Sequence, residues 1–305
     1  MTLLDRAIVR FLPAVPKPVV QRSSARYIAG PTLDDAVESV RRLNSGGKLA
    51  TIDVLGEEIS RVSEARSIAK TYRDVFAAIE RAELDSNVSV KLTGLGLDLS
   101  YDLCRENLED VVRTAAEHGN FVRIDMEDSS TTDETLRLYR ELRLAGHDNV
   151  GVVLQASLRR TLDDVRALGG LRPNVRLCKG IYVEPPPIAF TDDEAVRANF
   201  LRCLDEVLDV GAYPAVATHD EWLIVESLRR ISQRGLAVDE YELQMLLGVR
   251  EERADELVAE GHRLRVYVPF GEQWYAYSLR RLQENPAMAG TIARATAARV
   301  LRLGR

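Results

Sequence analysis

The sequence predicts an α/β fold: a distorted (βα)8 barrel of the TIM type with extra helices at its N-terminus. Two observations predict it. Short apolar runs alternate with amphipathic helical segments, and eight such runs can be counted. Strand–helix alternation favours parallel strands joined by right-handed crossovers, and eight units favour closure into a barrel. The length of 305 residues fits a barrel of about 250 residues plus one further segment.

The N-terminal segment, residues 1–30, is expected to form one or two short helices broken by prolines, because proline interrupts a helix. The remaining residues, 31–305, are expected to form the catalytic barrel as one domain. Its first element is an amphipathic helix over residues 32–46, with Thr32 as the N-cap and Gly46 as the stop.

The eight predicted strands then follow in turn. They are TIDVL (51–55), VSVKL (88–92), FVRIDM (121–126), GVVLQ (151–155), VRLCKG (175–180), AVATHD (215–220), YELQML (241–246) and LRVYVPF (264–270). Several intervening helices end at a glycine, as at Gly119 and Gly211. An open doubly wound sheet is the alternative. That fold favours a GxGxxG loop after an early strand, whereas KLTGLGLDL lacks the third glycine.

Composition narrows the function classes. The net charge of −6 argues against a general nucleic-acid surface, and no stretch approaches the length of a membrane span. The N-terminus lacks the uninterrupted apolar core of a secretion signal. Three dispersed cysteines, with no CxxC pair, fit a reducing cytoplasm and give no zinc signature. We therefore expect a cytoplasmic protein.

Polar side chains gather where the predicted strands end, which is the catalytic end of a barrel. Lysine is rare, with five among 41 basic residues, yet Lys91 and Lys179 both lie there. A charge in an apolar strand is costly unless it is paired or functional, so an ion pair such as Lys91 with Asp125 is the alternative at any one position. The whole set favours an active site: Lys91, Asp125, Met126, Glu127, Gln155, Arg176, Lys179, Gly180, Tyr182, Thr218, His219, Asp220, Glu242, Gln244 and Tyr267.

No catalytic metal is expected. Three histidines, His118, His147 and His262, precede strands and so belong to the opposite end of the barrel. Only His219 lies at the catalytic end. One histidine without a second histidine or a carboxylate pair makes a poor metal site.

The helix expected after the last strand carries Tyr277, Arg280, Arg281 and Glu284, whose spacing places them on one broad face. Guanidinium groups match a carboxylate, and Tyr267 and Tyr277 could line the rest of a small molecule. One inward and one solvated arginine is the alternative.

The ordered strand ends resemble the motifs of the proline dehydrogenase family. They are VSVKLTGLG, FVRIDMED, GVVLQA, VRLCKGIY, ATHD, YELQMLLG and VYVPFG with YSLRRLQEN, over about residues 88–285. RYIAG at 26–30 is similar to the family's N-terminal region. The resemblance implies FAD at the mouth of a distorted barrel. It also implies hydride transfer from L-proline to flavin N5, giving Δ1-pyrroline-5-carboxylate, with electrons passed to a membrane quinone. This is the first step of proline catabolism to glutamate.

The resemblance also implies residue roles. Asp125 and Arg176 are the expected catalytic residues. Substrate contacts are expected from Lys91, Leu246, Tyr267, Tyr277, Arg280 and Arg281, supported by Glu284. Flavin contacts are expected from Met126, Gln155, Arg176, Lys179, Gly180, Ile181, Thr218 and His219.

The chain departs from long bifunctional members at Val183, where those often carry an aromatic residue. It also carries no aldehyde-dehydrogenase part, so it resembles the short monofunctional type, whose product goes to a separate pyrroline-5-carboxylate dehydrogenase. The N-terminal segment is a candidate for a peripheral membrane contact, although such segments more often pack on the barrel.

Three alternatives remain open. The first is another flavin barrel of the folate-reducing type. The second is a Schiff-base aldolase that uses Lys91 or Lys179. The third is a non-catalytic barrel retained for interactions. A yellow protein bleached by L-proline would favour the proline dehydrogenase reading over all three.

Overall fold

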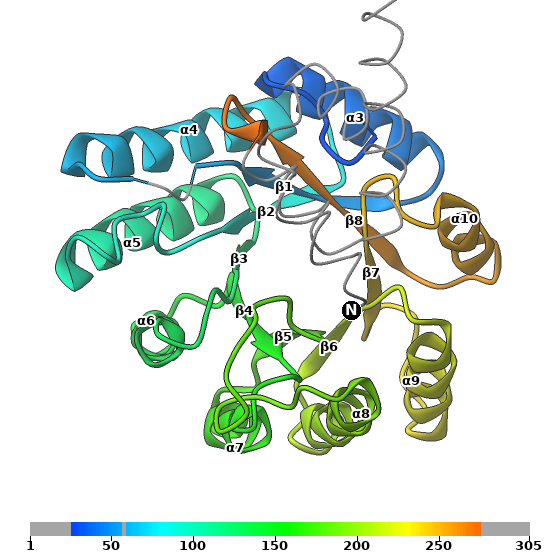
Figure 1. Cartoon of the computed structure of the whole chain (residues 1–305). Coiled ribbons are helices and arrows are strands. Elements are labelled where there is room, and N and C mark those ends of the chain that lie inside the picture. Colours follow the sequence, from blue (N-terminus) through cyan, green and yellow to red (C-terminus); the bar gives the residue numbers. More distant parts are fainter. Residues whose placement is uncertain (1–25, 57–58, 276–305) are drawn as a thin grey trace, which may run out of the picture.

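The computed structural model describes residues 26–56 and 59–275. Within them, eight parallel strands close into a barrel in sequence order, and β8 pairs with β1 (Figure 1). The strands are β1 (Leu49–Val54), β2 (Ser86–Val90), β3 (Val122–Ile124), β4 (Val150–Gln155), β5 (Asn174–Cys178), β6 (Tyr213–Ala217), β7 (Glu242–Leu246) and β8 (Leu264–Phe270). The predicted (βα)8 barrel and all eight predicted strands are confirmed. The expected N-terminal helices fall mainly in residues 1–25, outside the described residues, and stay a prediction.

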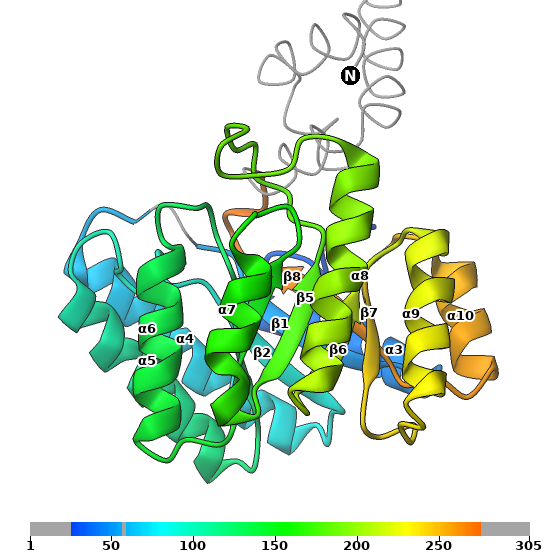
Figure 2. The same ribbon diagram turned by 90° about the horizontal axis from the view of Figure 1, so that it is seen from below.

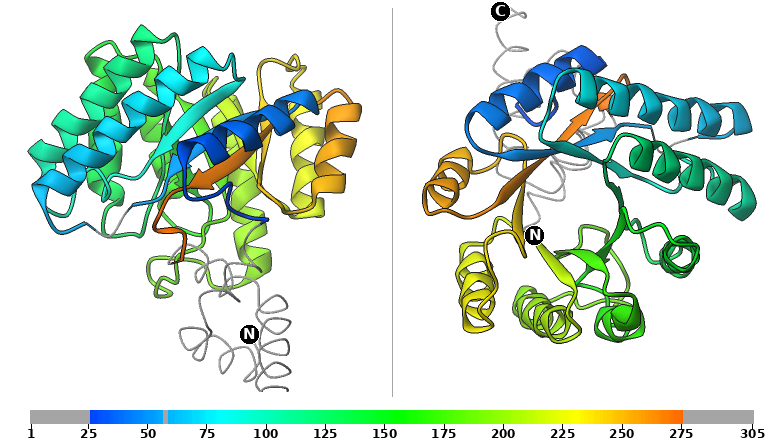
Figure 3. Two further views of the ribbon diagram at one scale, coloured as in Figure 1. Left: turned by 90° about the horizontal axis from the view of Figure 1, so that it is seen from above. Right: turned by 180° about the vertical axis from the view of Figure 1, so that it is seen from behind.

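Helices surround the strands. They are α3 (Leu33–Ser45), α4 (Val62–Arg81), α5 (Tyr101–Glu117), α6 (Thr132–Leu144), α7 (Thr161–Leu168), α8 (Asp193–Asp209), α9 (Glu221–Gln233) and α10 (Glu251–Ala259), with a short 3-10 turn, η2 (Gly169–Leu171), after α7. Helices α4 to α10 connect successive strands. Helix α3 precedes β1 and packs on β8 and β1 (Figure 3), so an element that comes before the first strand completes the ring.

The first barrel helix begins and ends as predicted. The side chain of Thr32 accepts a hydrogen bond from the backbone of Asp35, and the Asp35 carboxylate accepts one from the backbone of Thr32. This reciprocal pair is a capping box, which satisfies two backbone donors that the helix leaves free. Gly46 is the C-cap.

The apolar core lies between the strands and the helices. Outward-facing strand residues such as Ile52, Val90 and Ile124 are fully buried in it, together with Phe76 of α4 and Leu108 of α5. Because side chains alternate along a strand, the residues between these positions face the barrel interior. Only about half of the side chains of each strand therefore belong to this apolar layer.

The barrel interior is polar, which explains the charges inside the predicted apolar runs. It contains Thr51, Asp53, Asn87, Ser89, Arg123, Asp125, Arg176, Glu242, Gln244 and Arg265. Arg123 of β3 reaches across to β5, where its Nη1 donates to the carbonyl oxygen of Asn174 at 2.6 Å. Gly151 on the strand between leaves room for it, since a Cβ there would lie 2.5 Å from that Nη1.

Two chain segments close on the mouth of the barrel, the end where the strands' carboxyl ends lie. Residues 26–30 form a turn and a bend, and the amide of Ala29 donates to the Pro269 carbonyl at 2.9 Å. The connection from β5 to α8 projects beyond the helix ends (Figure 2). Residues 1–25 lie outside the described residues, so the expected division at residue 30 stays a prediction. In the described ranges, no helix is both long enough and apolar enough to cross a membrane.

Candidate active site

A cavity of about 320 Å³ opens at the carboxyl ends of the strands. Within the described ranges, every residue that was expected to contact the substrate or the flavin, or to take part in catalysis, lines it: Lys91, Asp125, Met126, Gln155, Arg176, Lys179, Gly180, Ile181, Thr218, His219, Leu246 and Tyr267. Three further polar residues of the predicted set, Glu127, Asp220 and Glu242, do not line it. Its volume lies within the range of small-molecule sites in proteins. The sequence therefore located one real cavity, on the expected face of the barrel.

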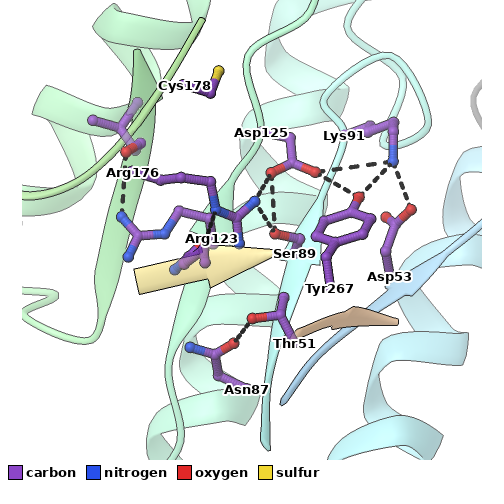
Figure 4. Close-up of polar contacts among 12 residues, drawn as sticks. Thr51, Asp53, Asn87, Ser89, Lys91, Arg123, Asp125, Arg176, Cys178 and Tyr267 are labelled. Atoms are coloured by element: carbon purple, nitrogen blue, oxygen red, sulfur yellow. Dashed lines mark hydrogen bonds and ion pairs between the residues drawn. The ribbon is translucent and has the colours of Figure 1, made fainter. Parts of the chain in front are cut away.

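Lys91 is held in a buried ion pair at one side of this cavity (Figure 4). It follows β2 directly, and its Nζ lies 2.7 Å from Oδ2 of Asp53 on β1. Nζ also donates to the Tyr267 hydroxyl at 3.2 Å. Burial alone would lower the pKa of Lys91, but the charge of Asp53, with Tyr267 and Asp125, raises it well above its usual value. The ammonium is therefore charged at neutral pH.

Asp125 joins the two cations at the floor of the cavity (Figure 4). Its Oδ1 accepts hydrogen bonds from Nη1 of Arg176 at 2.6 Å and from the Ser89 hydroxyl at 3.0 Å. Its Oδ2 accepts one from the Tyr267 hydroxyl at 2.9 Å and lies 3.9 Å from Nζ of Lys91. One carboxylate thus fixes the spacing of Lys91, Arg176 and Tyr267.

Arg176 is nearly buried and is tied down on two sides. Besides Asp125, Nη1 donates to the Ser89 hydroxyl at 3.0 Å, and Nε donates to Oε1 of Gln244 at 2.5 Å. The guanidinium carbon lies 5.4 Å from the centre of the Tyr267 ring. Within the described part of the chain, Nη2 makes no hydrogen bond, and Arg176 lines the cavity. This leaves one donor group for a bound molecule.

Lys179, farther out, is paired with the start of α9. Its Nζ lies 2.7 Å from Oδ2 of Asp220, which also accepts from Nε of Arg197 at 2.7 Å. Burial opposes ionisation of Asp220, but hydrogen bonds from Arg197 and Lys179 lower its pKa to about 2. Asp220 is also the N-cap of α9, where its side chain accepts from the amide of Leu223. The three described cations of the site, Lys91, Arg176 and Lys179, are thus each balanced by a carboxylate.

His219 and Thr218 serve neighbouring loops. Nε2 of His219 accepts from the amide of Leu246 at 2.9 Å, and the Thr218 hydroxyl accepts from the amide of Asp220 at 3.1 Å. Among residues 26–56 and 59–275, no group of three or more His, Cys, Asp or Glu side chains could hold a metal ion.

Gln155 and Gly180 form a close-packed edge of the cavity. Nε2 of Gln155 donates to the carbonyl of Glu127 at 2.8 Å, which leaves its oxygen near Gly180. Gly180 has a φ of +100°, and a Cβ there would lie 2.2 Å from the Ser157 hydroxyl. Glycine is therefore required here.

Glu127 ties the loops after β2 and β3 together. Its carboxylate accepts from the amide of Thr93 at 3.0 Å and from the Thr93 hydroxyl at 2.5 Å. Burial raises the pKa of Glu127, although the hydrogen bonds from Thr93 oppose the shift. These hydrogen bonds between Glu127 and Thr93 fix the two loops whose backbone carries Lys91 and Asp125.

Sequence reasoning missed part of the site. The predicted set lacks Asp53 and Ser89, although Asp53 is the single charge in TIDVL. It contains Gln244 only as a polar residue with no role, whereas the structure shows that Gln244 accepts a hydrogen bond from Arg176. The alternation of side chains along a strand is the signal that identifies these residues. Every second residue points to the barrel interior, and Asp53, Ser89 and Gln244 occupy such positions.

Four predicted residues of the last helix, Tyr277, Arg280, Arg281 and Glu284, lie outside the described residues. Their roles stay predictions.

Comparison with known proteins agrees with the geometry. The family model for proline dehydrogenase matches residues 36–294. The chain is 40% identical to proline dehydrogenase 1 of Bacillus subtilis strain 168 over 88% of each chain. It is 37% identical to proline dehydrogenase of Deinococcus radiodurans, covering 88% of this chain and 87% of that one.

A solved structure shows the same fold. Proline utilization A from Bdellovibrio bacteriovorus, inactivated by N-propargylglycine, superposes with a TM-score of 0.84 at 26% identity. The match covers 92% of this chain and 36% of that longer one.

Proposed function

The chain belongs to the proline dehydrogenase family, and we propose that it oxidises L-proline to Δ1-pyrroline-5-carboxylate with FAD as its cofactor. The observation that carries this proposal is the arrangement around Asp125, which brings two cations and a tyrosine to one cavity at the catalytic end of the barrel. This arrangement suits a small carboxylate beside a cofactor that gains negative charge.

The residues of the cavity fit a flavin. Its apolar wall includes Met126, Val153, Ala217 and Met245, which suit a flat ring system. Arg176 offers Nη2 on the polar side. Gly180 allows the backbone to approach closely, as a cofactor loop requires. We propose that Gln155, Lys179, Ile181, Thr218 and His219 complete the flavin contacts.

Proline would be held by its carboxylate. Lys91 supplies a charged ammonium from one side of the cavity, and Arg280 and Arg281 are proposed as its partners from the last helix, supported by Glu284. Leu246, Tyr267 and Tyr277 would line the proline ring. Guanidinium and ammonium groups around a carboxylate fix its orientation, and orientation is a large part of what an enzyme adds to cofactor chemistry.

The reaction removes a hydride from the ring carbon next to nitrogen and a proton from nitrogen, leaving a C=N bond. FAD, when bound, supplies the hydride acceptor at N5. The protein orients the ring carbon through the carboxylate contacts. Arg176 places positive charge where negative charge develops, which stabilises the transition state electrostatically. Asp125 holds Arg176 and Tyr267 in position.

The ion pair of Lys91 argues against its use as the Schiff-base lysine of an aldolase. A Schiff-base lysine needs a neutral amine, which enzymes obtain by lowering its pKa. Here Asp53 does the opposite, because it raises the pKa of Lys91 well above the usual value. The ion pair therefore favours a carboxylate-binding role.

Several partners remain part of the proposal. The electron acceptor is proposed to be a quinone, and the product is proposed to pass to a separate pyrroline-5-carboxylate dehydrogenase, toward glutamate. Peripheral membrane contact through the N-terminal segment, and a cytoplasmic location, stay predictions.

Substitution of Arg281 tests the substrate assignment. Arg281→Met should raise the proline KM strongly, by about 100-fold, while FAD stays bound, because a charge-assisted contact to the carboxylate is lost. Arg81→Met, at an exposed position at the end of α4, is the matched control and should leave KM unchanged. An Arg281→Met enzyme with the control's KM would remove Arg281 from the carboxylate site.

A further inference from the structure

A continuous chain of hydrogen bonds runs from the cavity into the barrel interior. It starts at Asp125, which accepts from Arg176 at 2.6 Å. Nε of Arg176 donates to Oε1 of Gln244 at 2.5 Å, and Nε2 of Gln244 donates to Oε1 of Glu242. Arg265 is the last residue of this hydrogen-bond series. Its Nε donates to both oxygens of Glu242, at 3.1 and 3.0 Å.

The amide of Gln244 can lie in only one orientation in this chain. Its oxygen faces an N–H donor of Arg176, and its NH₂ group faces the carboxylate of Glu242. A rotated amide would set NH₂ against N–H on one side and oxygen against oxygen on the other. Both neighbours are charged, and hydrogen bonds to charged groups are the stronger kind. Gln244 is therefore fixed from both sides.

Glu242 is the acceptor that holds Gln244 on the side away from the cavity. It is almost fully buried on β7, and burial by itself would favour its protonated form. The charges of Arg265 and Arg123 outweigh that effect and lower the pKa of Glu242 below its usual value. Arg265 is held in turn, because its Nη1 donates to the Ala50 carbonyl at 2.6 Å. A buried carboxylate that stays ionised gives Gln244 a constant acceptor.

We propose that Gln244 is a positioning residue for Arg176, and that the buried Glu242–Arg265 pair fixes Gln244 in turn. This inference rests on the proposed function. Asp125 and Ser89 hold one edge of the guanidinium, and Gln244 holds Nε on another. Nη2 would then face a bound flavin in one orientation. Loss of Gln244 leaves the guanidinium free to turn about its contact with Asp125, which weakens its stabilisation of the reduced cofactor.

The test is Gln244→Met in the FAD-loaded full chain. Methionine has similar length but neither hydrogen bond. We expect kcat to fall about tenfold while the proline KM stays within about twofold, because Lys91 is untouched. We also expect about tenfold weaker stabilisation of the reduced over the oxidised cofactor, which for a two-electron couple lowers the midpoint potential by about 30 mV.

The matched control is Thr51→Val, which removes the hydrogen bond of the Thr51 hydroxyl to Asn87 in the same interior, at 2.6 Å. It should leave both the potential and kcat unchanged. A Gln244→Met enzyme with the potential and kcat of this control would overturn the positioning role. A wild-type chain that binds FAD but does not oxidise proline would instead contradict the proposed function, so the two failures are distinguishable.

A second variant covers the case in which Gln244→Met does not fold. Gln244→Glu keeps the shape and the oxygen that faces Arg176, but it places two carboxyl groups side by side, which must share a proton. We expect a potential near that of wild type at low pH. At higher pH, where the shared proton is lost beside Arg176, the potential should drop further than in wild type. A potential with the wild-type pH dependence would overturn the proposal.

Discussion

Nζ of Lys91 lies 2.7 Å from Oδ2 of Asp53 and 3.9 Å from Oδ2 of Asp125, so strand β1 supplies its closest anion. The pairing of Lys91 with Asp125 alone, considered from the sequence, is therefore only part of the arrangement. Asp53 is fully buried and Lys91 nearly so. The pair keeps Lys91 charged and leaves Asp125 free to hold Arg176 and Tyr267.

Asp53→Asn should weaken both stability and proline binding. The variant leaves the ammonium with only the Asp125 carboxylate, whose Oδ2 lies 3.9 Å away, and breaking a buried pair such as Lys91–Asp53 costs about 3 kcal/mol. We expect the free energy of unfolding to fall by that order in urea denaturation, and the proline KM to rise about tenfold.

The control for Asp53 is Asp255→Asn. It removes the surface partner of Lys48, where Asp255 is 64% exposed, so a loss of less than about 1 kcal/mol is expected. Equal losses in the two variants would contradict the structural importance of the Lys91–Asp53 pair.

Asp220 gives a pH-dependent prediction. Its folded-state pKa, about 2, lies below the unfolded value of about 3.9. A lowered carboxyl pKa contributes stability above the unfolded pKa, and that stability is lost as pH falls through the folded pKa. Asp220→Asn should therefore be less stable than wild type by about 1–2 kcal/mol at pH 6, and the gap should shrink by about half at pH 3.

Urea denaturation at the two pH values measures this gap. Asparagine is also a good N-cap, so the start of α9 is preserved and the charge is the main change. A gap of constant size from pH 6 to pH 3 would show that the ion pairs of Asp220 with Lys179 and Arg197 do not stabilise the fold.

Gly151 gives a packing prediction. A Cβ at this position would lie 2.5 Å from Nη1 of Arg123 and 2.7 Å from the Asn174 carbonyl oxygen. Because that oxygen belongs to the backbone of β5, the barrel itself must shift. Gly151→Ala should therefore lower the free energy of unfolding by about 2 kcal/mol.

Gly170→Ala is the control for Gly151, since no atom outside its chain neighbours lies within 4 Å of a Cβ there. Its stability should stay within about 0.5 kcal/mol of wild type. A Gly151→Ala chain as stable as this control would contradict the close approach of Arg123.

The fold was predictable because its signal is periodic. Each strand is a short apolar run and each connection contains a helical pattern, so order and parallel pairing follow from local sequence. The position of α3 between β8 and β1 was not predictable. In sequence, α3 resembles any other amphipathic helix. Its place outside β8 and β1 becomes clear only when these two strands pair and close the barrel.

The site was predictable where strand ends carry unusual residues, and less so where inward positions meet across the barrel. Asp53 lies 38 residues before Lys91, and Gln244 lies 68 residues after Arg176. Sequence shows that each is polar, but the partners depend on which residues of different strands share a level inside the barrel. That depends on the register of the whole barrel.

The most direct test of the proposed function is an anaerobic titration of the purified, FAD-loaded chain with L-proline, followed by visible absorbance. We expect a yellow protein whose flavin absorbance is bleached in proportion to added proline and is restored by a quinone. A chain that cannot be loaded with FAD, or one that binds FAD and keeps its colour in excess proline, would contradict it.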